Sequence, residues 1–567
     1  MKRRIKQTIN FLSLTALLVS AVLIGSANAQ TGSTTVRGSV TDAQGGVIAG
    51  ATVRLVNEEK GFTRTATTSG NGTYTFSSVP PNAYRIEIEA NGFKKLVISN
   101  VVILVDIPAE ANAVLEAGNI SEVVNVSGGD LASIVNTQDA SLGNNFVSKQ
   151  IQELPLEGRN VANLLSLQPG VTQSGEVTGS RSDQANITLD GVDVNDQQNG
   201  TAFEPVLRVT PDSVDEFRVT TSNADSARGR SSGAQISLST KSGSNDFHGA
   251  LYEYHRNTKT TANDFFSNAA GRFGPNDFPV LAGSAKVGDE RAPRPKLIRN
   301  LFGGRLGGPI VKDRFFFFYN YEALREARET PVTRLVPLAT LGQGIVRFPS
   351  ATGVITTLTA AQINALTTNG NGAGSAVVDV NPAALAVLAS AAARYPANDA
   401  TVGDGLNTGG FRFNAKVPAE NNTHTMRFDW KVTRSEKHSV QFRGIFQNDF
   451  FDGAQRFPDT SGTRRISKPF GTLAGHTWVI NNSMVNNFRY GYTRQKFSDS
   501  GDATGDSLSF RSVFTPFNFA YPFSRETKTH NFVDDFSIIR GSHSIQFGGN
   551  FRIVRNRRSD ETPTHDS

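Results

Sequence analysis

The sequence predicts a mainly β protein: a small β-sandwich, then a mixed α/β domain, then a long antiparallel sheet. Three observations carry this prediction. Short β-rich runs separated by turns fill residues 34–116, about nine longer runs follow residue 245, and the connections between the longer runs alternate in length. The longer runs have about ten residues each, the length that crosses a bilayer at a tilt. We therefore expect the last part to be an antiparallel transmembrane β-barrel.

The composition fits a folded β-rich chain and excludes a helical membrane protein. The 567 residues include 53 Gly and 38 Phe, charged residues make up 19 %, and the net charge is +6. Spread over this length, the charge gives little support for nucleic-acid binding, which we do not expect. The sequence has no cysteine, so disulfides, thiolate metal sites and a cysteine nucleophile are excluded.

The N-terminus has the three parts of a secretory signal peptide. Basic residues at positions 2, 3, 4 and 6 precede an apolar run over 11–24, and Ala27-Asn28-Ala29 places small residues before Gln30. A membrane anchor is the alternative, but the run is short for a span of about 20 residues. We expect residues 1–29 to be cleaved between Ala29 and Gln30, and the protein to be exported.

Residues 34–116 contain six short β-rich runs at regular spacing, which favours a β-sandwich. The segments VRGSVTDAQGGVIAGATVRLVN and TSGNGTYTFSSVPPNAYRIEIEANGF resemble the carboxypeptidase regulatory-like domain, a transthyretin-like sandwich. The resemblance implies an accessory domain. We expect no peptidase activity, because a zinc site would need His and Glu clusters and residues 34–116 contain no His.

Residues 118–130 (GNISEVVNVSGGD) form a linker with a loosely alternating run between glycines. The run resembles the segment by which TonB-dependent receptors engage TonB, which pairs as an added strand. The resemblance implies TonB contacts at Ile120, Glu122, Val123, Val124 and Val126. An ordinary interdomain strand is the alternative.

Residues 131–243 carry three stretches in a fixed order. The first, IQELPLEGRNVANLLSLQPGV, has a helical pattern that is stopped by Pro169-Gly170. The second, NITLDGVDVND, is a strand that enters a turn. The third, FRVTTSNADSARGRSSGAQISLSTKSGSNDFHG, contains strands that are split by a polar loop. Together they resemble the plug domain of TonB-dependent outer-membrane receptors, and the Oar-like branch most. The resemblance implies that Leu189, Asp190 and Gly191 form the plug motif, in which the acid follows a buried strand.

Asp190, Asp193 and Asp196 place three carboxylates within seven residues, which raises the alternative of a Ca²⁺ site. Their spacing is not that of an EF-hand loop, and the first acid fits the plug motif, so we expect no metal there. H-E-x-x-H does not occur, the one G-x-S-x-G match (229–233) lies in a polar loop and not at a strand-to-helix nucleophile elbow, and the eight histidines are scattered. We therefore expect no catalytic residue, no cofactor and no enzyme activity.

The runs after residue 245 alternate in polarity. In 425–432 one face carries Met426, Phe428, Trp430 and Val432, and the other carries Thr425, Arg427, Asp429 and Lys431. Residues 544–554 follow the same rule, as do residues 487–495 except for Arg494. Short connections (308–313, 433–437, 481–483, 540–542) alternate with long ones (257–298, 323–421, 451–469, 498–530), as in outer-membrane barrels. A large soluble sandwich is the alternative, but it does not require this alternation.

Two further stretches make specific predictions. NLFGGRLGGPIVKDRFFFFYNYE (300–322) predicts a hairpin whose first strand breaks at Gly307, Gly308 and Pro309. It resembles Oar-like barrels, as does KSGSNDFHGALYEYHRN (241–257). Within the longest connection, 383–394 after Asn381-Pro382 predicts a helix with Pro in its first turn.

Barrels of the TonB-dependent type have about 22 strands around a plugged lumen, and an open edge is not tolerated in lipid. We therefore expect residues 245–567 to be the first part of an incomplete barrel, and the chain to be the N-terminal portion of a longer receptor. The resemblance implies TonB-dependent uptake of a large solute across the cell outer membrane. The implied partners are TonB, outer-membrane lipid and an unidentified extracellular solute such as a glycan or peptide. Surface adhesion or carbohydrate binding is the alternative function.

Overall fold

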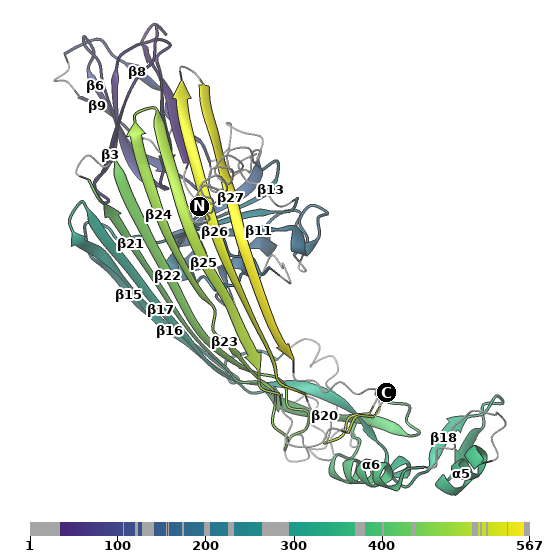
Figure 1. The fold of residues 1–567 in the computed structure, drawn as a ribbon. Helices are drawn as coiled ribbons and strands as arrows, with labels where there is room; N and C mark the ends of the chain where they lie inside the picture. The colour runs from purple at the N-terminus through teal and green to yellow at the C-terminus, as the bar shows by residue number, and fades with distance from the viewer. Residues whose placement is uncertain are drawn as a thin grey trace, which may run out of the picture.

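The computed structural model describes the chain from Thr34 to Asp560, in three domains and a loop module (Figure 1). Within that span the described residues exclude 106, 120–122, 128–140, 155, 157, 173–174, 198–203, 225–231, 264–293, 369–379, 400–401, 434–436, 502–507, 511–512, 517–519 and 541–542. The predicted cleavage site at Ala29 and Gln30 lies outside the described residues and stays a prediction.

The N-terminal domain, here called the sandwich domain, consists of two sheets, as predicted. One has the order β4-β1-β7 with β8 also on β1, and the other has the order β3-β2-β5-β6-β9. The strands are β1 (Thr34–Asp42), β2 (Thr52–Asn57), β3 (Phe62–Thr67), β4 (Thr73–Val79), β5 (Asn82–Glu89), β6 (Lys95–Ile103), β7 (Ala109–Glu110), β8 (Ala113–Leu115) and β9 (Val123–Ser127). The six runs read from the sequence are β1 to β6.

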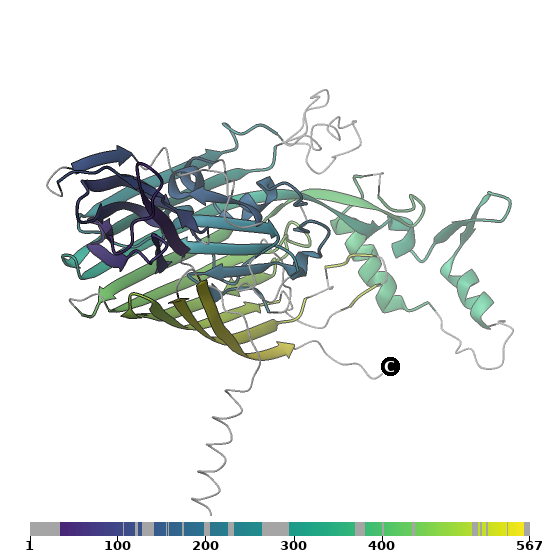
Figure 2. The ribbon, with the colours of Figure 1, turned by 90° about the horizontal axis from the view of Figure 1, so that it is seen from above.

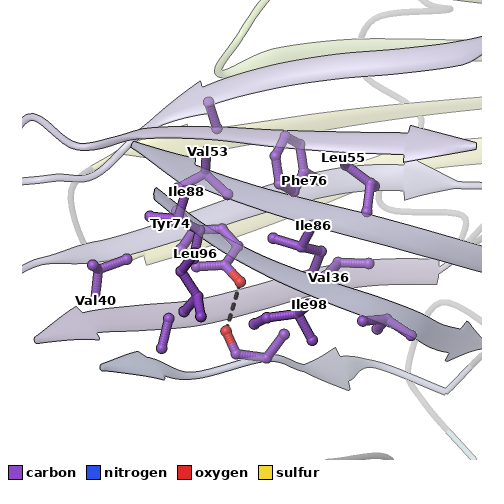
Figure 3. Close-up of a cluster of buried hydrophobic side chains, with 14 of the residues drawn as sticks. Val36, Val40, Val53, Leu55, Tyr74, Phe76, Ile86, Ile88, Leu96 and Ile98 are labelled. Carbon is purple, nitrogen blue, oxygen red and sulfur yellow. Dashed lines mark hydrogen bonds between the residues drawn. The ribbon is translucent and has the colours of Figure 1, made fainter. Parts of the chain in front are cut away.

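The core of the sandwich domain is apolar and is formed by side chains from both of its sheets (Figure 3). Val36 of β1 and Ile86 and Ile88 of β5 belong to one cluster and are completely buried. Tyr74 of β4 is buried in the same cluster, and its hydroxyl donates a hydrogen bond to the carbonyl oxygen of Ala111. This bond satisfies the one polar group that the tyrosine brings into the core.

The next part, here called the middle domain, is a five-stranded sheet with short helices. The strand order is β10-β13-β14-β11-β12. Its elements are β10 (Leu142–Val147), α2 (Ser148–Glu153), η2 (Val161–Leu167), η3 (Ser182–Gln184), β11 (Asn186–Leu189), β12 (Val192–Asp193), η4 (Pro211–Ser213), β13 (Val214–Ser222) and β14 (Gln235–Thr240). The predicted helix is the 3₁₀ helix η2, which buries Val161, Leu164 and Leu165. Leu167, which the helical pattern also included, is exposed at its end.

The C-terminal part is a long antiparallel sheet, here called the strand wall, which curves around the middle domain (Figure 2). Its order is β15-β16-β17-β21-β22-β23-β25-β26-β27, with β24 between β22 and β25 and β20 on β17. The strands are β15 (His248–Asn257), β16 (Leu297–Val311), β17 (Phe315–Pro337), β20 (Thr408–Lys416), β21 (Ala419–Lys431), β22 (His438–Asp452), β23 (Arg464–Ser467), β24 (Phe470–Asn481), β25 (Met484–Asp499), β26 (Phe523–Arg540) and β27 (His543–Asp560). All nine predicted runs are strands of this sheet.

The hairpin between β16 and β17 differs from its prediction. β16 does not break at Gly307, Gly308 and Pro309 but continues to Val311, with a register shift between Pro309 and Val311. A bulge at this point accommodates a proline, which cannot donate to the ladder. The turn follows at residues 312–314, where Asp313 has a φ of 60°.

The connection 323–421 is more ordered than the sequence suggested. β17 continues to Pro337 and pairs with β20, so part of the predicted loop extends the wall. The rest is a loop module of α4 (Ala339–Gly342), β18 (Val346–Pro349), β19 (Ile355–Leu358), α5 (Ala360–Thr368) and α6 (Pro382–Arg394). The predicted helix is α6: the Asn381 side chain accepts from the backbone N–H groups of Ala383 and Ala384, and Pro382 opens the first turn.

The two faces of the strand wall are unlike, and the polar face is the buried one. On β26 the buried residues Arg525, Thr527, Thr529 and Asn531 alternate with residues of the opposite face. The opposite face exposes large aromatic side chains, namely Trp430, Phe442, Phe446, Trp478 and Phe488. A water-soluble domain shows the reverse distribution, whereas a membrane barrel places apolar side chains outside. The predicted alternation is confirmed, because the wall's polar face lies against the middle domain.

Among the described residues, no helix is long and apolar enough to cross a membrane.

Replacing Ile86 by Ala tests the core of the sandwich domain. Ile86 is completely buried, so the free energy of unfolding of this domain should fall by about 2–5 kcal/mol. Hydrogen exchange of the β2 and β5 amides measures the change. Val102→Ala is the control, because Val102 is 42 % exposed and should cost at most about 0.5 kcal/mol. Equal effects of the two substitutions would contradict this description of the core.

Candidate functional site

The predicted plug motif forms a tight turn between β11 and β12. Leu189 is completely buried, and Asp190 and Gly191 turn the chain with φ values of 52° and 78°. Positive φ suits a glycine and is tolerated by aspartate. A Cβ on Gly191 would lie 3.1 Å from Nε of Arg489 on β25, so the strand wall approaches this turn closely.

The Asp190 carboxylate connects the middle domain to two wall strands. It accepts hydrogen bonds from the backbone N–H and the hydroxyl of Thr240, at 2.9 and 3.1 Å. Nε of Arg443 on β22 lies 3.1 Å from one carboxylate oxygen, and Nη1 of Arg427 on β21 lies 3.6 Å from the other. Arg443 is only 1 % exposed. Asp190 therefore supplies the negative charge that the buried Arg443 needs, and it adds to Asp429, which lies 2.9 Å from the partly buried Arg427.

The other two acids of the stretch meet other strands. Asp193 pairs with Arg552 of β27. Asp196 lies 3.4 Å from Arg525 of β26 and accepts from Nε2 of Gln495 on β25 at 2.8 Å. The three carboxylates thus diverge toward different arginines, and the described residues hold no group of three or more His, Cys, Asp or Glu arranged for a metal ion.

A second cluster lies at the other side of the middle domain. Arg159 pairs with Asp212 of the same domain and, at 3.3 Å, with Glu322 of β17. The rings of Tyr252 and Tyr254 on β15 cover its guanidinium at 5.1 and 4.5 Å, and the Tyr252 hydroxyl donates to Glu322 at 3.0 Å. Cation–π contact and a hydrogen-bonded ion pair stabilise the same charge.

Further polar contacts join the middle domain to the wall. We call all of these contacts, those described above and those that follow, the seam. Arg208 of the middle domain makes two hydrogen bonds to Asp449 of β22, at 3.2 and 2.8 Å. Arg305 of β16 lies 3.0 Å from Asp212, and the Asn320 side chain of β17 donates to the Thr210 hydroxyl at 2.9 Å. Sequence reasoning found the acids at 190, 193 and 196 but not their partners. The signal for the partners was present as the polar positions of each alternating strand.

The seam fixes the position of the middle domain inside the wall more than it adds to the free energy of unfolding. Burying an ion pair costs desolvation energy that offsets most of the attraction, but removing one partner leaves an uncompensated buried charge. The seam joins the middle domain to β16, β17, β21, β22, β25, β26 and β27. The middle domain therefore has one defined seat inside the wall.

The predicted TonB-contact segment lies away from the seam. Val123, Val124 and Val126 belong to β9, which pairs in parallel with β6 at the edge of the sandwich sheet. Val124 packs against the sandwich core, whereas Val123 and Val126 are exposed. Ile120 and Glu122 lie outside the described residues.

The sandwich domain contacts both other domains at the short-turn end of the wall (Figure 1). Nζ of Lys60 donates to the carbonyl oxygen of Gly243 at 2.7 Å, and Asn487 of β25 donates to the Ser78 hydroxyl at 2.7 Å. Burial lowers the pKa of Lys60. A cavity of about 240 Å³ lies among the three domains, between Lys60, Arg427 and other polar side chains.

Substituting Arg443 by Met tests the seam. The change leaves Asp190 short of a buried partner, and breaking a buried pair in this way costs about 3–5 kcal/mol. The melting temperature of the detergent-solubilised protein should fall clearly. Arg464→Met is the matched control, because the Arg464–Asp452 pair is exposed and contributes at most about 1 kcal/mol. Equal melting temperatures for the two variants would show that the pairing with Asp190 does not hold the domains.

Lys241, which directly follows β14 and lies near Arg305 and Asp212 of the seam, gives the stability of the protein a pH dependence. Burial lowers the pKa of Lys241 to about 8, and the nearby Arg305 acts in the same direction. An unfolded lysine titrates near about 10.4, so the unfolded chain binds more protons between these two values. The contribution of Lys241 to stability should therefore rise as the pH increases from about 8 to about 10.4. Across this pH range the melting temperature should rise less for Lys241→Met than for the wild type. Parallel plots of melting temperature against pH would contradict the assignment.

Comparison with known proteins agrees with this architecture. A family model described as "Outer membrane beta barrel domain" matches residues 239–566, and one described as "Carboxypeptidase regulatory-like domain" matches residues 35–116. The TonB-dependent transporter Oar of Myxococcus xanthus is 25% identical over 328 residues, which is 54% of this chain and 28% of that protein. The match thus spans little more than a quarter of that relative.

Solved structures give weaker likenesses. The outer membrane transporter YddB from Escherichia coli is 12% identical with a TM-score of 0.43, over 73% of this chain and 48% of that one. The ferric-catecholate import receptor Fiu from E. coli is 13% identical with a TM-score of 0.38, over 76% and 62%. On the family match, which covers more than half of its residues, the chain belongs to the outer membrane β-barrel family, is homologous to Oar and is a protein of the outer membrane.

Proposed function

We propose that this protein takes part in TonB-dependent transport of a large solute across the outer membrane, with the middle domain as the plug. The observation that carries the proposal is the seam: the polar face of the wall holds a folded domain through ion pairs that reach six strands and a hydrogen bond to a seventh, β25. A domain held in this way blocks a conduit, and it can move because its contacts are polar and can be exchanged for water.

Energy coupling is assigned to the segment that includes β9. β9 is the edge strand of its sheet, and an edge presents unpaired backbone groups to which a partner strand adds. β9 precedes the middle domain in the chain, so a pull on it is transmitted to β10. For the pull to reach the middle domain, β9 has to separate from β6. The partner in this proposal is TonB, as for the relative Oar.

The solute would meet the loop module first. The module is anchored to the wall by a buried cluster, in which Tyr395, directly after α6, stacks on Phe457 of the β22–β23 connection with ring centroids 3.8 Å apart, beside Phe411 of β20. It stands at the long-loop end of the wall (Figure 2), which in outer-membrane barrels is the extracellular side. Long ordered loops often carry binding functions. In this proposal the solute undergoes no covalent change, so no catalytic residue is assigned.

Surface adhesion or carbohydrate binding is the second candidate function, and the same loop module favours it. Phe348 and Ile355 of its β18–β19 hairpin are 40 % and 48 % exposed, and exposed apolar side chains suit a surface contact. An adhesion protein would use the module without needing β9 to move. The mobility of β9 therefore separates the two functions.

A reversible covalent link between β6 and β9 tests the proposed transport. Lys95 and Val123 are direct register partners, so their Cα atoms lie about 5 Å apart, within disulfide range. The chain has no other cysteine, so Lys95→Cys/Val123→Cys forms one defined bond. Cells that carry the oxidised variant should lose uptake of candidate glycans and peptides, and a reductant should restore it.

Two controls accompany the link. Thr52→Cys/Glu89→Cys joins β2 to β5 within the sandwich domain and leaves β9 free, so uptake should continue. Replacing residues 120–126 by a Gly/Ser segment of equal length should abolish uptake and binding of the periplasmic domain of TonB. Uptake that survives both the β6–β9 link and this replacement would refute energy coupling through β9, and would favour the surface-binding function.

A further inference from the structure

A row of basic side chains crosses three neighbouring strands of the wall at the long-loop end. Its members, here called the basic row, are Arg494 and Lys496 of β25, Lys528 of β26, and Arg555 and Arg557 of β27. On each strand they alternate with residues that face the middle domain, such as Gln495 and Arg525, which contact Asp196. Since side chains alternate across a strand, the basic row lies on the outward, membrane-facing side.

The basic row brings like charges together. Arg494 of β25 is the register partner of Lys528 of β26, which in turn is the partner of Arg555 of β27. Two residues further from the membrane centre, Lys496 of β25 and Arg557 of β27 are the register partners of Glu526 of β26. Neighbouring strands are about 4.8 Å apart, and like charges placed directly opposite each other are destabilising. Three cations in line therefore require a compensating anion.

The protein itself supplies few of the negative charges that would compensate the basic row. Among the described residues at these outward positions, the one carboxylate is Glu526, which lies 3.3 Å from Nζ of Lys528. Nε of Arg494 is buried and has no hydrogen-bond acceptor in the described part of the chain. Its guanidinium lies 5.8 Å from the ring of Phe470, which shields it from water on one side. This arrangement leaves several positive charges for an external partner.

The depth of the basic row identifies that partner. Tyr492, His530 and Ile553 lie two residues nearer the membrane centre than Arg494, Lys528 and Arg555 on their strands, which is about 7 Å along a strand. The Tyr490 hydroxyl and Nδ1 of His530 are 2.9 Å apart, in an outward band of aromatic side chains. Such bands mark the boundary of the hydrocarbon. The basic row therefore lies at headgroup depth on the side of the long loops.

We propose that the basic row binds a phosphorylated lipid headgroup of the outer leaflet. Arginine offers two parallel N–H donors to phosphate oxygens, and lysine offers a compact charge beside them. The lipid's acyl chains would lie along the aromatic band below. One bound headgroup would offset the repulsion among Arg494, Lys528 and Arg555 and would tie β25, β26 and β27 together. The site is independent of solute transport, since it uses the outward face alone.

Native mass spectrometry of the whole chain in neutral detergent tests this site. The probe is bisphosphorylated lipid A, with its dephosphorylated form and inorganic phosphate as separate arms. Arg494→Gln/Lys528→Gln/Arg555→Gln should raise the apparent Kd for lipid A by about tenfold or more. The matched control is Lys312→Gln/Lys437→Gln/Arg540→Gln, which removes three cations at the short-turn end and should change the Kd less than about twofold.

The three ligands show whether the basic row recognises the phosphate of a lipid headgroup, the lipid without its phosphate, or free phosphate. Equal binding of the dephosphorylated lipid, displacement of lipid A by inorganic phosphate at matched concentration, or an unchanged Kd in the triple variant would each overturn the proposal. The charge-preserving variant Arg494→Lys/Lys528→Arg/Arg555→Lys should retain binding. If the triple Gln variant does not fold, Arg555→Gln alone decides: the Kd should rise severalfold, and a wild-type Kd would overturn the proposal.

Discussion

The structure depends on one constraint: each strand of the wall has a polar face that must be satisfied by another part of the protein. Arg443 and Arg525 are buried on that face and pair with Asp190 and Asp196 of the middle domain. Unpaired buried charges are far too costly to persist, so the wall needs the carboxylates of the middle domain. The apolar face needs the membrane, because exposing its large apolar side chains to water is unfavourable. The curved sheet is thus placed between two environments, and neither alone would support it.

The seam follows from this constraint and shows how it is met. Asp190, Asp193 and Asp196 lie at the end of one short strand, yet they pair with Arg443, Arg552 and Arg525 on three different wall strands. A purely apolar contact would allow the middle domain to slide, because hydrophobic attraction has no direction. Ion pairs of defined geometry do not allow this. The polar contact therefore gives a unique seat together with the capacity to be broken one pair at a time.

Local sequence patterns predicted the helices and strands, but not the residues far along the chain with which they pair. Alternation identified the nine wall strands, and turn spacing identified β1 to β6, because both signals are local. The pairing of Asp193 with Arg552 spans 359 residues, and nothing in the local sequence distinguishes Arg552 from other polar positions. The pairing of β9 with β6 was also out of reach, since backbone hydrogen bonds do not depend on side-chain identity. Arg494 was the one exception in its strand pattern, and it lies in the basic row.

The order of strands in the middle domain bears on the proposed function. β10 forms one edge of its sheet and β11–β12 form the other, where Asp190, Asp193 and Asp196 lie. A pull through β9 would reach the edge at β10, away from those acids. β10 is held by its ladder to β13 and by side-chain bonds such as Arg218 to Asn145. Edge strands open locally at lower cost than central ones, so separation would begin at β10 and the ion pairs with Asp190, Asp193 and Asp196 would break last.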